Sequence, residues 1–138
     1  MLSYRHGFHA GNFADVFKHF ILVYLLNNLK KIKQKINKFV KDRDWDQFHS
    51  PKNLAMALSV EVSELVEIFQ WLKDSDIKKV DKEKVSQEIA DIFFYLLRIA
   101  EKMNIDIEKS FHKKMLINIK KYPVKLAKGN SKKRYLKN

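Results

Sequence analysis

The sequence predicts an all-α fold, and three observations support this class. Apolar residues recur every three or four positions along four long stretches, which is the spacing of a buried helical stripe. No run alternates apolar and polar residues as a half-buried strand would. The 138 residues include only 3 Gly and 2 Pro, so few positions interrupt the helices. A chain of this length is expected to form one domain with a small core, which favours association.

The first two helices follow from apolar spacing and from a capping pair. A first helix is expected over about residues 13–40, followed by a loop or short turn over residues 43–49. Ser50 and Pro51 are a typical N-cap and first-turn pair. They predict that a second helix begins there and continues to about Leu72.

The last two helices are separated by short polar segments. After a polar connection over residues 73–81, apolar spacing predicts a third helix over about residues 82–103. Asp106 is suited to cap a fourth helix that runs to about Lys121. That helix must end there because Pro123 disfavours helical geometry in the residue before it.

The charge of the chain is distributed unevenly. The net charge is +12, yet residues 42–112 hold 10 Lys and Arg against 15 Asp and Glu. Residues 30–41 hold 6 Lys and residues 113–138 hold 10 Lys and Arg, and neither segment contains an acid. A solvated lysine-rich surface or contact with nucleotide phosphates explains these flanks better than polynucleotide binding, so nucleic acid is not expected as a partner.

The composition also limits the compartment and the chemistry. The chain contains no Cys, which excludes a disulfide framework, a cysteine zinc site and a cysteine nucleophile. The longest strongly apolar run, residues 20–26, is too short to cross a bilayer, and the start does not have the order of a signal peptide. We therefore expect a soluble cytoplasmic protein without a membrane partner.

Two acid pairs on consecutive helices are the most informative feature. Glu61 and Glu64 are spaced i, i+3, as are Glu88 and Asp91, so each pair lies on one helical face. A single such pair is usually a solvated helix face. Four carboxylates converging among apolar neighbours would repel one another, so some must stay protonated or a cation must neutralise them. Oxygen ligands without His or Cys favour a hard ion, Mg²⁺ before Mn²⁺.

Aromatic residues stand where a nucleotide would need them. Trp71 follows Glu64 by seven residues, about 10 Å along a helix, and Tyr95 follows Glu88 in the same way. Trp45 lies in the loop before the second helix. These aromatics could clamp a base at one end of a metal and phosphate site, whereas the alternative for each of them is packing in the core.

Basic residues near the end of the chain complement this site. Lys114, Lys121 and Lys128 are candidates for holding phosphates. Three histidines near the start could suggest a metal cluster, but packing or loop hydrogen bonds explain them better. They are His6, His9 and His19.

The acid pairs and their flanks resemble a known family. Glu61-x-x-Glu64 followed by Glu88-x-x-Asp91 resembles the signature of MazG-like pyrophosphohydrolases. Four flanking segments are similar to the dCTP-pyrophosphatase branch, and the resemblance covers about residues 38–135. The segments are Arg43 to His49, Phe69 to Trp71, Asp91 to Leu96 and Lys121 to Val124.

The resemblance implies a fold and an activity. The fold would be a helical bundle completed by dimerisation, or by a dimer of dimers. The activity would be metal-dependent hydrolysis of a (deoxy)nucleoside triphosphate, dCTP or a related pyrimidine nucleotide, to a monophosphate and pyrophosphate, with water attacking the α-phosphorus in line. One carboxylate would orient that water, and the sequence does not say which one.

The resemblance also implies roles for individual residues. Catalysis and Mg²⁺ binding would fall to Glu61, Glu64, Glu88 and Asp91. The nucleotide would be held by Trp45 and Trp71 at the base and by Tyr95 in the pocket, with further contacts from His49, Lys114, Asn118, Lys121 and Lys128. Some relatives have a substrate-contacting histidine where residues 35–37 of this chain are Lys, Ile and Asn, so the base preference stays open.

A second resemblance concerns the start of the chain. Residues 1–31 resemble the opening of a ribosomal-RNA adenine-N6 methyltransferase, but the sequence has neither a glycine-rich cofactor loop nor an Asp/Asn-Pro-Pro-Tyr element, so methyl transfer is not expected. We expect three parts: residues 1–37 as a leader that forms an extra helix, residues 38–122 as the pyrophosphohydrolase domain, and residues 123–138 as an irregular basic tail.

Two other classes of protein remain open at this point. A non-enzymatic helical module that binds RNA or the ribosome would explain the leader and the basic flanks, and its binding would depend steeply on salt. A structural helical dimer could pair its acids with lysines across an interface. Mg²⁺ would then change neither its thermal stability nor its nucleotide binding.

Overall fold

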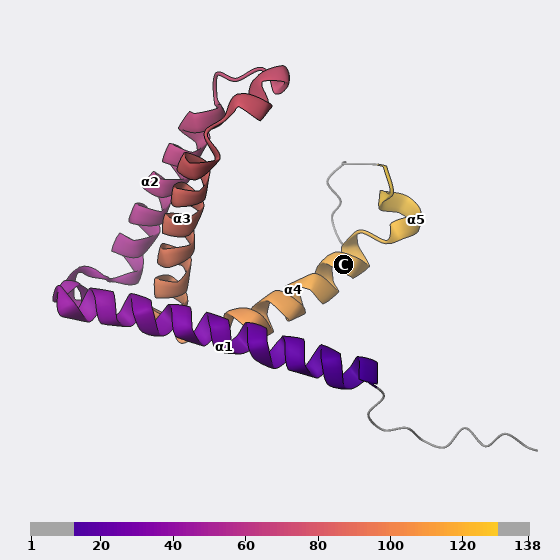
Figure 1. Ribbon diagram of the computed structural model, residues 1–138, viewed down its shortest axis with the longest axis horizontal. Helices are drawn as coiled ribbons and strands as arrows, with labels where there is room; N and C mark the ends of the chain where they lie inside the picture. The colour runs from indigo at the N-terminus through magenta and orange to yellow at the C-terminus, as the bar shows by residue number, and fades with distance from the viewer. Residues whose placement is uncertain (1–12, 130–138) are drawn as a thin grey trace, which may run out of the picture. The chain divides into compact units, whose positions relative to one another are not determined.

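The described backbone, residues 13–129 of a computed structural model, consists of helices joined by turns and short connections and contains no strand, which confirms the all-α class (Figure 1). Side chains are described from residue 28 to residue 129, except at position 74, so those of His6, His9 and His19 lie outside the described residues. The elements are α1 (Phe13–Asp42), the 3₁₀ helix η1 (Trp45–Phe48), α2 (Pro51–Phe69), the 3₁₀ helix η2 (Asp74–Lys79), α3 (Lys82–Lys102), α4 (Ile107–Lys121) and α5 (Val124–Ala127).

Side-chain caps set where the helices begin. The Ser50 hydroxyl accepts a hydrogen bond from the backbone N–H of Asn53 at 3.2 Å at the start of α2. The Asp106 carboxylate accepts one from Lys109 N–H at 3.0 Å at the start of α4. Both capping predictions are confirmed, and each cap satisfies a donor that the first turn leaves unpaired.

Two boundaries differ from the sequence prediction. The predicted end of the second helix at about Leu72 is wrong, because α2 ends at Phe69 and Leu72 N–H bonds to the Phe69 carbonyl in a tighter turn. No helix was predicted after residue 122, but the short helix α5 forms at Val124–Ala127. Pro123 is the N-cap of α5, with a carbonyl that accepts from Ala127 N–H at 3.0 Å, so the residue that ends one helix also begins the next.

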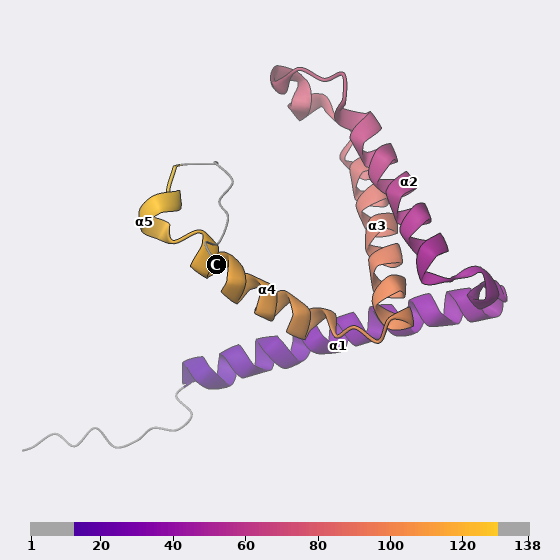
Figure 2. The same ribbon diagram turned by 180° about the vertical axis from the view of Figure 1, so that it is seen from behind.

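The chain divides into two compact units between Gln47 and Phe48, and each is described by itself. In the second unit, α2 and α3 run side by side in opposite directions, as the views from both sides show (Figures 1 and 2). Among the described elements, this is the one extensive contact between helices. Its best-buried apolar side chains are Leu54 of α2 and Leu97 and Ala100 of α3. The α2/α3 pair is therefore the frame on which other residues of this unit are placed.

One charged side chain is buried in this frame. Arg98 of α3 is only 3% exposed. Its Nη1 donates to Oε2 of Glu101 at 2.6 Å, and its Nε donates a long hydrogen bond, 3.4 Å, to Nδ1 of His49 just before α2. The guanidinium therefore ties the segment that enters α2 to the C-terminal half of α3.

Large apolar side chains remain exposed on every major helix of the second unit. More than half of the side chain is exposed at Val60 and Val66 of α2, Ile89 of α3, and Phe111, Leu116 and Ile119 of α4. Large apolar side chains exposed in this number are typical of a protein that another molecule partly covers. No helix in the described part of the chain is long and apolar enough to cross a membrane.

Replacing Arg98 tests whether this buried side chain holds the α2/α3 pair together. We expect Arg98→Ala to lower the free energy of unfolding by about 3 kcal/mol, because it opens a cavity where the buried side chain stood and removes its hydrogen bonds to Glu101 and His49. Lys79→Ala is the matched control, since Lys79 pairs with Asp76 at 2.8 Å but is 80% exposed. The control should cost less than about 1 kcal/mol. Urea unfolding followed by far-ultraviolet circular dichroism measures both, and equal losses would contradict the assignment.

Candidate metal centre

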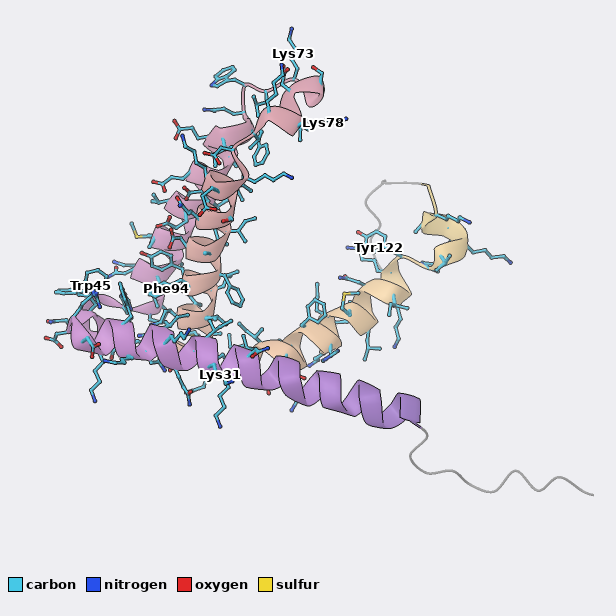
Figure 3. The ribbon with its side chains drawn as sticks, viewed as in Figure 1. Lys31, Trp45, Lys73, Lys78, Phe94 and Tyr122 are labelled. Atoms are coloured by element: carbon cyan, nitrogen blue, oxygen red, sulfur yellow. The ribbon has the colours of Figure 1, made fainter. Side chains whose placement is uncertain are left out.

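Three carboxylates from the α2/α3 pair meet at one point. Glu61 of α2 and Glu88 and Asp91 of α3 each offer an oxygen, and these oxygens lie within 4.8 Å of one another. Oxygen-ended side chains gather along the middle of the two helices (Figure 3). The antiparallel packing of α2 and α3 therefore turns the acidic faces predicted from the i, i+3 spacing toward each other.

Glu64, the fourth predicted acid, belongs to the same cluster. Its negative charge raises the pKa of Glu61 and of Glu88 by repulsion, and each of these two carboxyl groups can donate a hydrogen bond to it when protonated. All four acids predicted from the sequence are therefore close enough to interact. The i, i+3 spacing explains this, because it stacks the members of each pair on successive turns of one helix.

The cluster makes its own ionisation unfavourable. Partial burial and then repulsion from Glu64, Asp91 and Glu88 raise the pKa of Glu61 above its ordinary value. Desolvation and repulsion from Glu64 and Asp91 raise the pKa of Glu88 in the same direction. Among the described residues, the side chains that shift these two pKa values are all carboxylates, so this negative charge is balanced by protons or by a bound cation.

The donor set fits a hard divalent cation. The cluster offers carboxylate oxygens, and the group of potential ligands found among the described residues contains neither His nor Cys. Oxygen-rich sites suit Mg²⁺, Ca²⁺ and Mn²⁺ rather than Zn²⁺ or Cu²⁺. Glu61, Glu88 and Asp91 could therefore hold such an ion.

Tyr95 lies one turn beyond Asp91 on α3 and borders the cluster. Its pKa is raised by burial and then by the negative charges of Glu61 and Asp91. A phenol beside carboxylates stays protonated and can donate a hydrogen bond toward the cluster. The structure thus brings the predicted pocket residue Tyr95 next to the predicted metal ligands.

Trp45 lies in the first unit, at the start of η1. Its ring meets the Phe39 ring edge to face, with centroids 5.6 Å apart and an interplanar angle of 77°. The indole remains 44% exposed. Trp45 is therefore held by α1 side chains while part of its ring faces outward.

Trp71 has a different setting from the one that helix geometry predicts. Because α2 ends at Phe69, Trp71 lies in the turn that follows and is no longer related to Glu64 by helical spacing. Its side chain is 88% exposed. Trp71 is therefore not part of the core of the described second unit.

His49 contacts side chains of α3. Besides accepting the long hydrogen bond from Arg98, its ring meets Phe94 edge to face at 6.5 Å, and Phe94 in turn meets Tyr95 at 5.2 Å. Phe94 is labelled on α3 in Figure 3. A row of contacts thus runs from the buried Arg98 through His49 and Phe94 to Tyr95 at the carboxylate cluster.

The predicted phosphate contacts lie on the last two helices. Lys114, Asn118 and Lys121 are on α4, and Lys128 directly follows α5. None of these four is among the groups that shift the pKa of Glu61 or Glu88. The structure therefore places the four acids and Tyr95 together and leaves these basic residues outside that cluster.

Three residues make contacts that the sequence did not predict: Arg98, Phe39 and Arg43. Arg98 interrupts the apolar run of α3 between Leu97 and Ile99, and a charged residue inside such a run can indicate a buried, paired charge. Phe39 falls within the first predicted helix, and nothing in its spacing indicates a role beyond helix packing. Arg43 was seen only as part of a motif, and nothing in the spacing indicates that its guanidinium lies on the Phe39 ring.

Comparison with known proteins defines the family. A model described as the MazG-like family matches residues 56–135, so this chain belongs to the MazG-like family. In the dCTP-pyrophosphatase branch, the chain is 36% identical to dCTP pyrophosphatase 1 of Homo sapiens over 110 residues, which are 76% of this chain and 65% of that protein. It is 34% identical to the Rattus norvegicus protein of the same name over 108 residues, 75% of this chain and 64% of that protein. The chain thus spans slightly less than two thirds of the length of these curated relatives.

A solved structure supports the same relationship. The crystal structure of a pyrophosphatase from Archaeoglobus fulgidus is 37% identical to this chain and superposes with a TM-score of 0.66. The match covers 70% of this chain and 93% of the archaeal chain. The helical arrangement described above is therefore that of a known pyrophosphatase structure.

The resemblance of the leader is also confirmed. The chain is 67% identical over 30 residues to Ribosomal RNA large subunit methyltransferase J of Haemophilus influenzae, and 58% identical over 31 residues to the Escherichia coli protein of that name. Each match covers 22% of this chain and 11% of the methyltransferase. The matched segment is therefore only a small part of each methyltransferase.

Glu61→Gln tests the electrostatic strain in the cluster. Because the pKa of Glu61 is raised by folding, its protonation favours the folded state. This contribution is fully present below the ordinary value of 4.5 and is lost as the pH rises through the raised value. Without metal, Glu61→Gln should therefore melt at a higher temperature than the wild type at pH 7, and the difference should shrink toward pH 4.5.

Thermal unfolding in the presence of a chelator, at several pH values, measures this effect. The control is Glu67→Gln, which changes an exposed acid on the same helix outside the cluster. A Glu61→Gln variant that is less stable than the wild type at pH 7 without metal would refute the proposed repulsion.

Proposed function

We propose that this protein is a Mg²⁺-dependent nucleoside triphosphate pyrophosphohydrolase that converts dCTP or a related pyrimidine nucleotide to its monophosphate and pyrophosphate. The observation that carries the proposal is the meeting of Glu61, Glu88 and Asp91 within 4.8 Å in a chain of the MazG-like family. The names of the relatives supply the substrate and the reaction class, because they are dCTP pyrophosphatases and a pyrophosphatase. A cytoplasmic site of action is part of the same proposal.

The chemistry follows from the donor set. When bound, Mg²⁺ supplies positive charge to the phosphate oxygens and lowers the pKa of a neighbouring water molecule. The four carboxylates would hold the cation, and one of them would accept a proton from the water that attacks the α-phosphorus. The new bond joins that water oxygen to phosphorus, and the bond between the α-phosphorus and the oxygen bridging to the β-phosphate breaks. Pyrophosphate leaves with that bond's electron pair.

The raised pKa values suit the role of proton acceptor. A carboxylate whose pKa is raised is a stronger base near neutral pH than an ordinary one. Glu61 and Glu88 both have this property. Either Glu61 or Glu88 could orient the attacking water. The one with a carboxylate oxygen that does not bind the metal would have this role.

The remaining predicted residues would hold the nucleotide. Trp45 and Trp71 present exposed indole rings on which a base can stack. Tyr95 borders the carboxylates and would line the pocket near the sugar and phosphates. We assign the outer phosphate and substrate contacts to a second group of residues: His49, Lys114, Asn118, Lys121 and Lys128.

We further propose that the active assembly is a homodimer or a homotetramer. The described core of the second unit contains few fully buried side chains, whereas α2, α3 and α4 all expose large apolar residues. A second copy of the chain would bury this surface, as isologous interfaces of symmetric oligomers do.

A panel of nucleoside triphosphates with Mg²⁺, analysed by chromatography and phosphorus NMR, tests the activity. We expect dCTP or a close pyrimidine relative to give the monophosphate and pyrophosphate. Glu64→Gln and Asp91→Asn should each lower kcat at least about 1000-fold, since each removes charge that holds the cation, whereas Glu67→Gln should act like the wild type. Mg²⁺ should raise the melting temperature of the wild type but not that of Asp91→Asn.

Other products would point to the other classes. Release of a diphosphate and orthophosphate would refute attack at the α-phosphorus. A protein that hydrolyses no triphosphate, yet binds RNA with a steep salt dependence unaffected by Asp91→Asn, would be the binding module considered above.

The assembly is tested by light scattering coupled to size-exclusion chromatography. The wild type should elute with two or four times the chain mass of 16.5 kDa. Leu116→Lys places a charge on a leucine that is 63% exposed and should shift the protein toward the monomer if α4 lies in the interface. Lys113→Glu, an exposed change on the same helix, is the control. A monomeric wild type would contradict the proposed assembly.

A further inference from the structure

We propose that Arg43 and Phe39 are positioning residues that hold the indole of Trp45 as a surface for stacking a nucleobase. This inference rests on the proposed function, because it assigns a supporting structure to the tryptophan that would hold the base. Phe39, Arg43 and Trp45 all belong to the first unit. We call them the aromatic platform.

The platform is built on the end of α1. After Asp42, Arg43 N–H bonds to the Val40 carbonyl at 3.3 Å and Asp44 N–H bonds to the Lys41 carbonyl at 3.1 Å. Asp44 has a φ of 53°, in the left-handed region, which Asp tolerates better than most residues. This turn reverses the chain, so Trp45 comes back against the Phe39 ring.

Arg43 packs on both rings. Its Cζ lies 3.7 Å from the centroid of the Phe39 ring and 5.9 Å from that of Trp45. Its Nη1 donates to the Phe39 carbonyl at 3.1 Å, so one guanidinium both caps the last turn of α1 and covers the aromatic face. A lysine has no planar group with which to do both.

The turn is fixed from its other side by Gln47. Its Nε2 donates to the backbone carbonyl of Asp44 at 2.9 Å and to the Asp44 carboxylate at 2.8 Å. Trp45 therefore lies in a turn that is closed at both ends by side-chain hydrogen bonds, one from Arg43 and one from Gln47. Such a setting limits the directions that the indole can take.

The platform leaves surface free for a ligand. Trp45 is 44% exposed and Phe39 is 41% exposed. Arg43 uses one N–H in the hydrogen bond to Phe39 and keeps others for acceptor atoms of a bound molecule. An exposed ring held by a guanidinium suits a flat, π-bonded ligand such as a nucleobase, and a ring already held in place loses less entropy when the ligand binds.

Fluorescence of Trp45 tests the platform without any reference to hydrolysis. The chain has two tryptophans, so Trp71→Phe leaves Trp45 as the single emitter. In that background, Arg43→Gln and Phe39→Leu should shift the emission to longer wavelength and increase quenching by acrylamide. Lys41→Gln removes the same charge as Arg43→Gln from an exposed position near the end of α1 and should change neither signal. Phe39→Tyr keeps the ring and should behave like the parent.

A second experiment measures nucleotide binding, with dCMP and Mg²⁺ as the probe. Titration should quench Trp45 emission, and the Kd should rise roughly threefold to tenfold in Arg43→Gln and Arg43→Lys but not in Lys41→Gln, since a loosened ring loses part of a base stack. In chains that keep Trp71, the same Arg43 variants should raise KM for dCTP by a similar factor. Their kcat should stay close to that of the wild type, because the carboxylates lie on other helices.

The outcomes separate this inference from the proposed function. Unchanged fluorescence and unchanged dCMP affinity in the Arg43 and Phe39→Leu variants would overturn the platform, whether or not the protein hydrolyses dCTP. A lower kcat at constant KM would overturn it as well. A wild-type protein that hydrolyses no triphosphate would refute the proposed function, while the fluorescence and dCMP results would still decide on the platform.

Discussion

Four carboxylates that repel one another lie between α2 and α3, and the packing of these two helices has to tolerate their charge. Glu61 and Glu64 of α2 face Glu88 and Asp91 of α3, and the oxygens of three of them lie within 4.8 Å of one another. Each added charge raises the cost of ionising the others. The packing of α2 on α3 must offset this cost. A divalent cation bound among these carboxylates would relieve their repulsion, and this relief would favour binding of the cation.

The repelling carboxylates lie away from the best-buried apolar contacts of the α2/α3 pair. Leu54, Leu97 and Ala100 are nearly fully buried toward one end of the α2/α3 pair, while the acids lie farther along the two helices. The buried Arg98 pairs at this packed end with Glu101, which is partly exposed, and with His49. The buried contacts that stabilise the pair therefore lie where α2 begins and α3 ends, and the charged carboxylates lie in the middle of the pair.

The residues proposed to hold metal and base are supported by different physical means. The carboxylates depend on the packing of two helices, whereas Trp45 depends on a local turn, one guanidinium and the Phe39 ring. Because α2, α3 and α4 also expose large apolar side chains, the isolated chain leaves much of its apolar surface in contact with water. A second copy that covered this surface would also make the frame around the metal more rigid.

Four long helices, the caps at Ser50 and Asp106, and the pairing of the acids on two helical faces could all be predicted from the amino-acid sequence. These features are local, since they depend on spacing along one helix or on a side chain within three residues of its backbone partner. The sequence could not show that the two acidic faces meet, that α2 ends at Phe69, or that Arg98 is buried. Nor could it show that Arg43 lies on Phe39. Such contacts depend on which faces pack together and on where the chain turns, and no period in the sequence records either.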